Sequence, residues 1–125
     1  MNTVKTEIEG VLLINLKSYR DKRGFFLEKY QFERYSENGI KDNFIQDNHS
    51  RSKKNVLRGL HYQLNPYAQS KLISTINGSI FDVLVDLRKS SPTYKKWAGI
   101  NLNSQNKNIL WIPSGFAHGF LSLED

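Results

Sequence analysis

The chain has 125 residues, enough for one domain and few for two, and it has no cysteine, which excludes disulfides and thiol nucleophiles. Hydrophobic residues make up 38% of the sequence, with 7 Phe, 6 Tyr and 2 Trp, so a packed core is expected and wholesale disorder is excluded. The net charge of +6 fits either a solvated surface or an anionic ligand such as a phosphate compound or a nucleic acid. The basic residues are dispersed, so we expect no nucleic-acid partner.

The sequence lacks the features of an exported or membrane-bound chain. No apolar run approaches the roughly 18 residues of a membrane span. The N-terminal sequence MNTVKTEIEG has no apolar core of the kind found in signal peptides. We therefore expect a cytoplasmic protein with no membrane partner.

Alternation of apolar and polar residues predicts an all-β chain with one short helix at Gln31–Asn38, which ends at Gly39. Turn residues separate the strands, and Asn77-Gly78 predicts a two-residue hairpin between its neighbours. Many short strands favour an antiparallel sandwich or barrel. In chain order, the expected strands are Val11–Leu16, Phe25–Tyr30, Phe44–Asp47, Val56–Gln63, Lys71–Ile76, Ile80–Leu87, Ala98–Leu102, Ile109–Ile112 and Phe116–Leu123.

Two of these strands carry further expectations. In Ile80–Leu87, the residues Phe81, Val83 and Val85 fall on one face, while Asp82 and Asp86 fall on the other. The last expected strand, Phe116–Leu123, has no strand after it. We expect a sheet that ends there to have an open edge or to need a partner chain.

His61 stands out because charged and polar side chains surround it within one expected strand. Arg58, Gln63 and Lys71 are close in sequence, and a buried strand rarely collects such groups unless they line a cavity. Strict alternation puts Arg58 and His61 on opposite faces, so a shared cavity requires a bulge, for which Gly59 is the natural place. A base among cationic donors can remove a proton next to a carbonyl and stabilise the enolate.

His118 lies in a Gly-bounded segment far along the chain and is a second candidate for the site. Asp82 could orient His118 or His61 by fixing the tautomer, and the sequence leaves open which one. The third histidine is His49. With no His-x-His pair and no cysteine, we expect no metal site.

Two other polar segments are candidates for ligand binding. Arg23 could hold a phosphate and Phe26 could stack on a base, although a charged turn entering a strand has the same composition. The segment Gln46–Ser50 is dense in hydrogen-bonding side chains, as in a sugar-binding wall or a polar loop.

Several long motifs together resemble the dTDP-4-dehydrorhamnose 3,5-epimerases, which are cupin-like jelly-roll enzymes of dTDP-L-rhamnose synthesis. The resemblance runs from about Val11 to the last residue. It is carried by the sequences RGFFLE, FIQDNHSRSKKNVLRGLHYQ, AQSKL, GSIFDVLVDLRKSSPTY and LWIPSGFAHGFLSL. It implies an antiparallel cupin-like jelly roll and epimerisation of dTDP-4-dehydro-6-deoxy-D-glucose at C3 and C5, without metal or organic cofactor.

The resemblance also implies roles for individual residues. His61 matches the family's general base, and Lys71 matches the lysine that stabilises the enolate at the C4 oxygen. The other matches line the substrate site: Arg58 and His118 at the sugar and diphosphate, Gln46 and Asn48 at the substrate, and Arg23, Phe26 and Glu28 in a nucleotide-binding segment that the family's homodimer lends to its partner.

The family pattern extends past Asp125. We expect residues 1–125 to form a single cupin-like domain that lacks the family's last strands. The family's tyrosine acid and the aspartate paired with the base would both lie beyond Asp125. Tyr62, Tyr67 and Tyr94 do not match that tyrosine. We expect the isolated chain to have impaired activity, because loss of a general acid costs roughly 10²–10⁴ in rate.

Two alternatives to the double epimerase stay open at this point. A related cupin, either a ketoisomerase or a single-carbon epimerase, would differ in which substrate carbons exchange with solvent. A non-catalytic module that binds a nucleotide sugar or nucleic acid would keep its affinity in His61→Ala and exchange no substrate proton.

Overall fold

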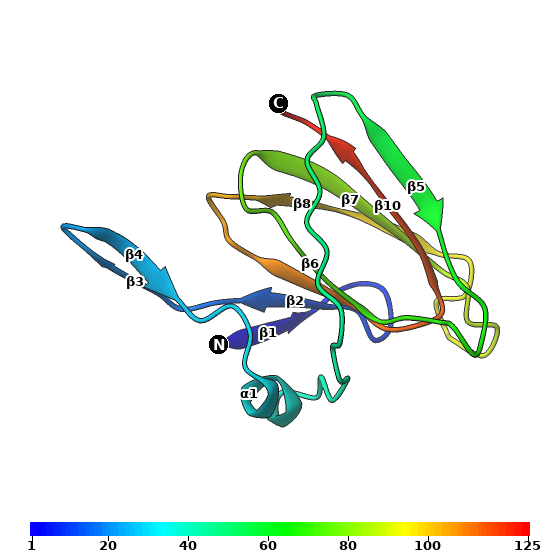
Figure 1. The fold of residues 1–125 in the computed structure, drawn as a ribbon. Coiled ribbons are helices and arrows are strands. Elements are labelled where there is room, and N and C mark those ends of the chain that lie inside the picture. Colours follow the sequence, from blue (N-terminus) through cyan, green and yellow to red (C-terminus); the bar gives the residue numbers. More distant parts are fainter.

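The structure, a computed structural model, describes residues 1–125 as two four-stranded antiparallel sheets, a separate hairpin and one helix (Figure 1). One sheet has the strand order β1-β2-β9-β6 and is called the β6 sheet; the other has the order β5-β10-β7-β8 and is called the β5 sheet. Strands β3 and β4 pair only with each other. The elements are β1 Asn2–Lys5, β2 Leu12–Asn15, β3 Ser18–Asp21, β4 Gly24–Leu27, α1 Phe32–Glu37, β5 Leu57–His61, β6 Lys71–Ser74, β7 Ser79–Asp86, β8 Trp97–Asn103, β9 Ile109–Ile112 and β10 Phe116–Ser122.

Apolar side chains from both sheets form the core, which confirms the expected all-β sandwich of jelly-roll type. The main cluster of buried residues joins strands of the two sheets and the loop after β1. Its members are Ile8, Val11, Leu84, Ala98, Leu102, Leu110, Ile112 and Phe116. Each fully buried aliphatic side chain contributes about 1.5–3 kcal/mol relative to an exposed one, so this cluster supplies most of the cohesion between the sheets.

The helix α1 packs on the face of the β6 sheet that points away from the main core. The side chain of Gln31 caps it by accepting a hydrogen bond from the Arg34 N–H at 2.7 Å, and Gly39 follows its C-cap with φ of +90°. Tyr35 is 1% exposed and packs in a second buried cluster with Ile14, Ile40 and Ile109. The predicted helix is therefore confirmed within a residue at each end.

The expected strand Phe44–Asp47 is absent. Residues 41–52 make no backbone–backbone hydrogen bonds and run as an extended segment from α1 to β5 (Figure 1). Side chains hold the segment instead: Trp111 donates its indole N–H to Asp42 at 3.0 Å, and Phe44 packs edge-on against Tyr30. One anchored aromatic side chain thus produced the apparent alternation.

The Asn77-Gly78 turn does not form the predicted hairpin. β6 pairs with β9, while β7 pairs with β8 and β10, so the connection at residues 75–78 crosses from one sheet to the other. Gly78 does adopt a left-handed φ of +79°. The dipeptide correctly predicted a local reversal, but it carries no information about which strands pair.

The two strands that the sequence pattern missed are β1 and β3, both rich in polar residues. The expected open edge is also in the wrong place. β10 pairs on both sides, with β5 and β7, and the edge strands of its sheet are β5 and β8. No helix in the structure is long and apolar enough to cross a membrane.

The inner face of β7 is the one that carries the aspartates. Asp82, Leu84 and Asp86 are all 0% exposed, whereas Phe81 and Val83 on the other face are only half-buried. Two carboxylates therefore lie inside the sandwich, where each requires hydrogen-bonding partners.

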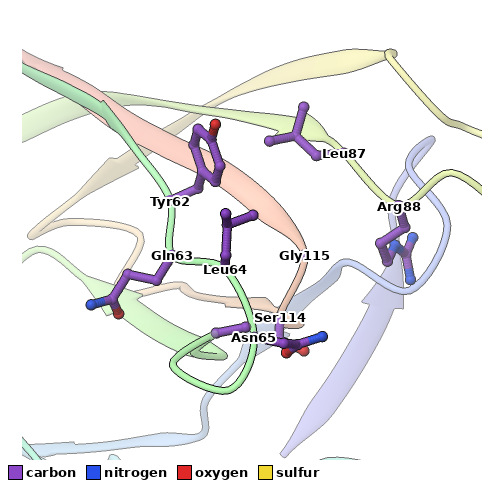
Figure 2. A pocket seen from close by; sticks show the side chains of 9 residues that line it. Tyr62, Gln63, Leu64, Asn65, Leu87, Arg88, Ser114 and Gly115 are labelled. Carbon is purple, nitrogen blue, oxygen red and sulfur yellow. The ribbon is translucent and has the colours of Figure 1, made fainter.

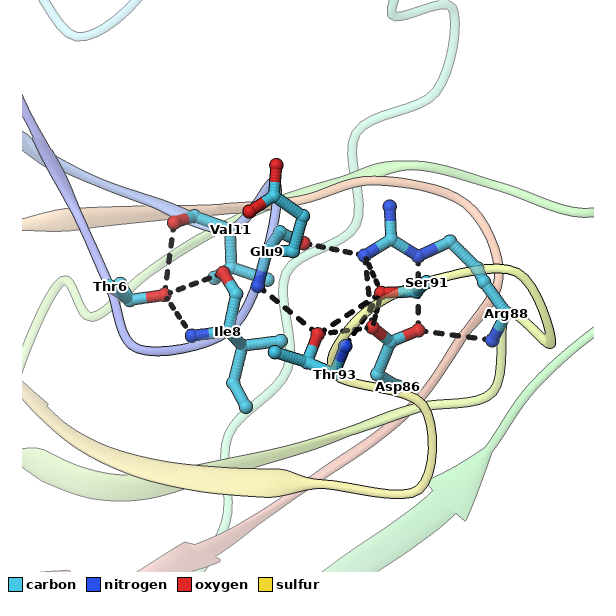
Figure 3. A network of polar contacts seen from close by, with 8 residues as sticks. All are labelled: Thr6, Ile8, Glu9, Val11, Asp86, Arg88, Ser91 and Thr93. Atoms are coloured by element: carbon cyan, nitrogen blue, oxygen red, sulfur yellow. Dashed lines mark hydrogen bonds and ion pairs between the residues drawn. The ribbon is translucent and has the colours of Figure 1, made fainter.

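A polar network around Asp86 ties the β7–β8 connection to the loop after β1 (Figure 3). Arg88 donates to both carboxylate oxygens at 3.0 Å, and the hydroxyls of Ser91 and Thr93 donate at 2.6 Å. Thr93 also accepts the backbone N–H of Glu9 at 3.2 Å. Burial alone would raise the pKa of Asp86, but these hydrogen bonds outweigh it and hold the pKa below its ordinary value.

We predict that Asp86→Asn lowers the free energy of unfolding by about 2–4 kcal/mol, because it leaves Arg88 without its buried partner. The native carboxyl has a lowered pKa, so its stabilising contribution is complete above the ordinary carboxyl pKa of about 4 and is lost as pH falls below that value. Urea unfolding from pH 7 to pH 3 measures both effects.

Asp21→Asn is the matched control, because Asp21 receives the same backbone and guanidinium hydrogen bonds from Arg23 as Asp86 receives from Arg88, but on the surface. An exposed pair contributes little. Equal destabilisation by the two substitutions would show that the buried network has no special role.

Candidate functional site

A bulge in β5 brings Arg58 and His61 to one face of the β5 sheet. Against β10, His61 pairs with His118 and Arg58 pairs with Phe120, so two residues of β5 lie opposite the single residue Gly119 of β10. Gly59, between them, has a left-handed φ of +109°. Cross-strand partners share a face, so His61, Arg58 and His118 all belong to the inner side of the sandwich. The bulge predicted at Gly59 is therefore confirmed.

His118 and Asp82 form a buried pair on that inner face. His118 Nε2 lies 2.8 Å and 3.0 Å from the two carboxylate oxygens of Asp82. The histidine is 8% exposed and the aspartate 0% exposed. Of the two imidazoles that Asp82 could orient, it is His118 that it orients. The same geometry leaves Nδ1 of His118 as the ring nitrogen available to a ligand.

Lys71 faces this pair from the opposite sheet. It begins β6 and pairs with Ile112, which is 1% exposed in the core, so both side chains point into the sandwich. Burial raises the pKa of Asp82 above its ordinary value, while the hydrogen bond from His118 and the positive charge of Lys71 act in the opposite direction. Lys71 is therefore close enough to influence the buried carboxylate electrostatically.

Arg58 is held by the extended segment that precedes β5. Its Nε donates to the Ser52 hydroxyl at 2.9 Å, and Nη2 donates to the Arg51 carbonyl at 3.1 Å. Ser52 in turn accepts a hydrogen bond at its carbonyl from the Ser122 hydroxyl. The sequence pattern gave no sign of this support, because Ser52 and Ser122 are far apart in the chain.

Gln46 and Asn48 lie on the same extended segment, where the Gln46 amide donates to the Asn48 side chain at 3.2 Å. Both are exposed. They belong to no strand of either sheet and are free to contact a ligand.

Arg23 and Phe26 lie on the β3–β4 hairpin, which projects away from the sandwich (Figure 1). Phe26 is 70% exposed, and Arg23 is ion-paired with Asp21 at 2.6 Å. Glu28, just after the hairpin, pairs with Arg34 of α1 at 3.0 Å. The chain therefore does not bring these three residues to its own His61.

A surface cavity of about 310 Å³ lies at the end of the sandwich, beyond β5 (Figure 2). Figure 2 shows Tyr62 and Leu64 on the segment after β5, across from Leu87. Its lining does not include His61 or Lys71, so this cavity is adjacent to the candidate base but is not the space between the two sheets. The lining residues are Tyr62, Gln63, Leu64, Asn65, Ala68, Leu87, Arg88, Ser114 and Gly115.

The structure contains no group of three His, Cys, Asp or Glu side chains that could hold a metal ion. What the inner faces do offer is an imidazole, His61, on an exposed edge strand, together with cationic groups from both sheets. This arrangement can accept a proton from a bound molecule and stabilise negative charge that develops next to it.

Comparisons with known proteins agree on one family. The sequence model of dTDP-4-dehydrorhamnose 3,5-epimerase matches residues 5–125. The enzyme of that name from Shigella flexneri is 57% identical over 126 residues, covering 100% of this chain and 70% of that protein. The dTDP-4-dehydrorhamnose 3-epimerase of Streptomyces niveus is 38% identical over 119 residues, covering 94% of this chain and 58% of that protein.

A solved structure gives the same result. The crystal structure of the dTDP-6-deoxy-D-glucose-3,5-epimerase of Legionella pneumophila, in complex with dTDP-4-keto-L-rhamnose, matches with a TM-score of 0.94 and 52% identity. The match covers 98% of this chain and 65% of that chain.

Two packed antiparallel sheets with polar groups facing each other between them define a cupin-like jelly-roll protein with an inter-sheet site. The family-model match over residues 5–125 and the sequence identities above 50% narrow the assignment from this fold class to one family. The chain belongs to the dTDP-4-dehydrorhamnose 3,5-epimerase family.

We predict that Asp82→Asn frees the His118 ring. In the parent protein, the buried Nε2–H bonded to Asp82 should exchange slowly with solvent and give its own ¹H–¹⁵N NMR signal. An amide in place of the carboxylate accepts this hydrogen bond more weakly, so the signal should weaken or disappear. With only three histidines in the chain, assignment is simple.

Asp47→Asn is the control, because it removes an exposed carboxylate two residues before His49. It should leave the slow signal unchanged. A slow signal that survives Asp82→Asn at full intensity would contradict the role given to Asp82.

Proposed function

We propose that this chain epimerises dTDP-4-dehydro-6-deoxy-D-glucose at C5 and C3, giving dTDP-4-dehydro-L-rhamnose, with His61 as general base and Lys71 as the group that stabilises the enolate. The observation that carries the proposal is the placement of His61 and Lys71 on the facing inner sides of the two sheets. The family membership supports the choice of substrate.

The chemistry requires this combination of groups. A C–H bond next to a ketone is too weakly acidic to lose its proton to an ordinary imidazole. The negative charge that develops on the C4 oxygen must therefore be stabilised in the same step. Lys71 supplies a positive charge, and His118, fixed by Asp82, supplies a second ring nitrogen on the same inner face.

Arg58 and the extended segment serve substrate binding in this proposal. Arg58 keeps a fixed position through Ser52 and Arg51, so its charge is available to a diphosphate without a large loss of side-chain freedom. Gln46 and Asn48 would hydrogen-bond the substrate from the exposed segment beside it.

We predict that His61→Asn abolishes exchange of substrate protons with D₂O at both C5 and C3, a loss of at least about 10²–10⁴ in rate. Lys71→Met should cause a loss of similar size, because the enolate is no longer stabilised. Proton NMR of the substrate in D₂O measures each position separately, and this exchange requires only the base and a stabilised enolate.

Lys89→Met is the matched control for Lys71→Met, since Lys89 is an exposed lysine on the connection between β7 and β8. It should exchange at the parent rate. Persistent exchange in His61→Asn would rule out His61 as the base. Absence of exchange in the parent, with dTDP still bound, would favour a non-catalytic binding module.

A single-carbon epimerase is the second candidate, because the Streptomyces niveus relative is a 3-epimerase. The same experiment separates the two. Label at C5 and C3 supports the double epimerase, and label at C3 alone supports the second candidate. The higher identity to the Shigella flexneri double epimerase favours the first.

We also propose a homodimer in which the β3–β4 hairpin reaches the active site of the second copy. The hairpin pairs with no other strand of its own chain, and an isolated two-stranded hairpin is marginally stable. Tyr19, Phe25 and Phe26 are 57%, 55% and 70% exposed on it, an apolar surface that a partner would cover. Arg23 would leave Asp21 to hold a phosphate there.

We predict that mixing two inactive variants restores activity. Arg23→Ala/Phe26→Ala disables the hairpin and His61→Asn disables the base, so a mixed dimer keeps one intact site. Deuterium exchange should return on mixing, and light scattering should give the mass of two chains. A monomer in solution, or two variants that stay inactive together, would contradict the shared site.

The cytoplasmic location and the single-domain organisation of the chain stay predictions.

A further inference from the structure

Gly59 and Gly119 lie on neighbouring strands with their backbones in direct contact. A Cβ atom on Gly59 would lie 2.7 Å from both the Gly119 Cα and the His118 carbonyl oxygen. A Cβ on Gly119 would lie 2.5 Å from the Arg58 carbonyl oxygen. Because the obstructing atoms are backbone rather than flexible side chains, a side chain at either position would force β5 and β10 apart.

This contact occurs at the point where the strand register shifts. Phe120 pairs with Arg58, and His118 pairs with His61, so the extra residue of β5 lies directly opposite Gly119. A regular ladder that started from the Arg58–Phe120 pair would place Leu60, not His61, opposite His118. The bulge therefore decides which side chain reaches the inner face.

We propose that Gly119 is a positioning residue for the proton-transfer site: by admitting the β5 backbone at Gly59, it allows the bulge that places His61 opposite His118 and on the same face as Arg58. This inference rests on the proposed function for its catalytic consequence, while its structural content can be tested separately.

Gly119 gives a cleaner test than Gly59. Gly59 has φ of +109°, so any side chain there is strained whatever the available space. Gly119 is not in the left-handed region, so alanine fits its backbone, and only the contact with β5 opposes the substitution.

The first measurement reads the register through disulfide formation, which is convenient because the chain has no cysteine. In the parent, His61→Cys/His118→Cys should oxidise readily, and Leu60→Cys/His118→Cys should not, since only the former side chains share a face. Adding Gly119→Ala should suppress the 61–118 bond and favour the 60–118 bond.

The second measurement uses the histidine-intact protein. Gly119→Ala should slow deuterium exchange at C5 and C3 by about 10²-fold, because a displacement of about 1 Å at a reacting group costs that much. The dTDP affinity, measured by calorimetry, should change only a few-fold, because Arg58 keeps its hydrogen bonds to Ser52 and Arg51 and the other proposed nucleotide contacts lie on the β3–β4 hairpin.

Gly99→Ala is the matched control. Gly99 lies on β8 of the same sheet, has no left-handed φ, and a Cβ there would meet only the Phe81 ring, a side chain that can move. It should lower stability without changing the disulfide preference or the exchange rate per folded molecule.

Two results would overturn the proposal. One is a parent protein in which Leu60→Cys/His118→Cys oxidises as readily as His61→Cys/His118→Cys, and this result does not depend on how Gly119→Ala folds. The other is a folded Gly119→Ala with unchanged disulfide preference. A parent with the expected disulfides but no deuterium exchange would instead contradict the proposed function.

Discussion

The register of β5 against β10 is the constraint on which the site depends. One extra residue in β5 puts His61 opposite His118 and turns Arg58 to the same face, and two glycines in backbone contact make room for that residue. Without the bulge, alternation would put His61, the candidate base, and Arg58, the candidate phosphate-binding residue, on opposite faces of the sheet. The position of the imidazole is thus fixed by backbone packing rather than by hydrogen bonds to its ring.

The strand β7 carries two buried aspartates, one of which stabilises the fold while the other belongs to the candidate site. Asp86 and Asp82 lie on one face, and both are fully buried. Asp86 is surrounded by donors from its own connection, which lower its pKa and tie down the loop after β1. Asp82 has a single strong partner, His118, and burial raises its pKa. The carboxylate with many donors is structural, and the carboxylate with one titratable partner belongs to the candidate site.

Local sequence patterns predicted most of the fold, because strands with one buried face alternate regularly. Ile109–Ile112 was predicted residue for residue, and the helix was predicted together with the glycine that follows it. The errors came from long-range pairing. Asn77-Gly78 reverses the chain as expected, yet its neighbours pair with strands tens of residues away. The alternation around Phe44 reflects one anchored ring rather than a ladder.

The same limit applies to the site. The residue types around His61 indicated a cavity. They also indicated a bulge at Gly59, because strict alternation would have put Arg58 and His61 on opposite faces of the strand. The partner of Asp82, the hydrogen bond from Ser122 to Ser52 and the contact of Gly119 with β5 all join distant segments of the chain. The resemblance to the family supplied roles for residues, but only the strand register shows which of them share a face.

A crystal structure of this chain with a bound dTDP-6-deoxyhexose tests the central claim most directly. We expect the sugar between the two sheets, with the His61 ring beside the C5 and C3 hydrogens and the Lys71 ammonium hydrogen-bonded to the oxygen at C4. A sugar bound outside this space, or a His61 ring turned to the outer face of the β5 sheet, would contradict it.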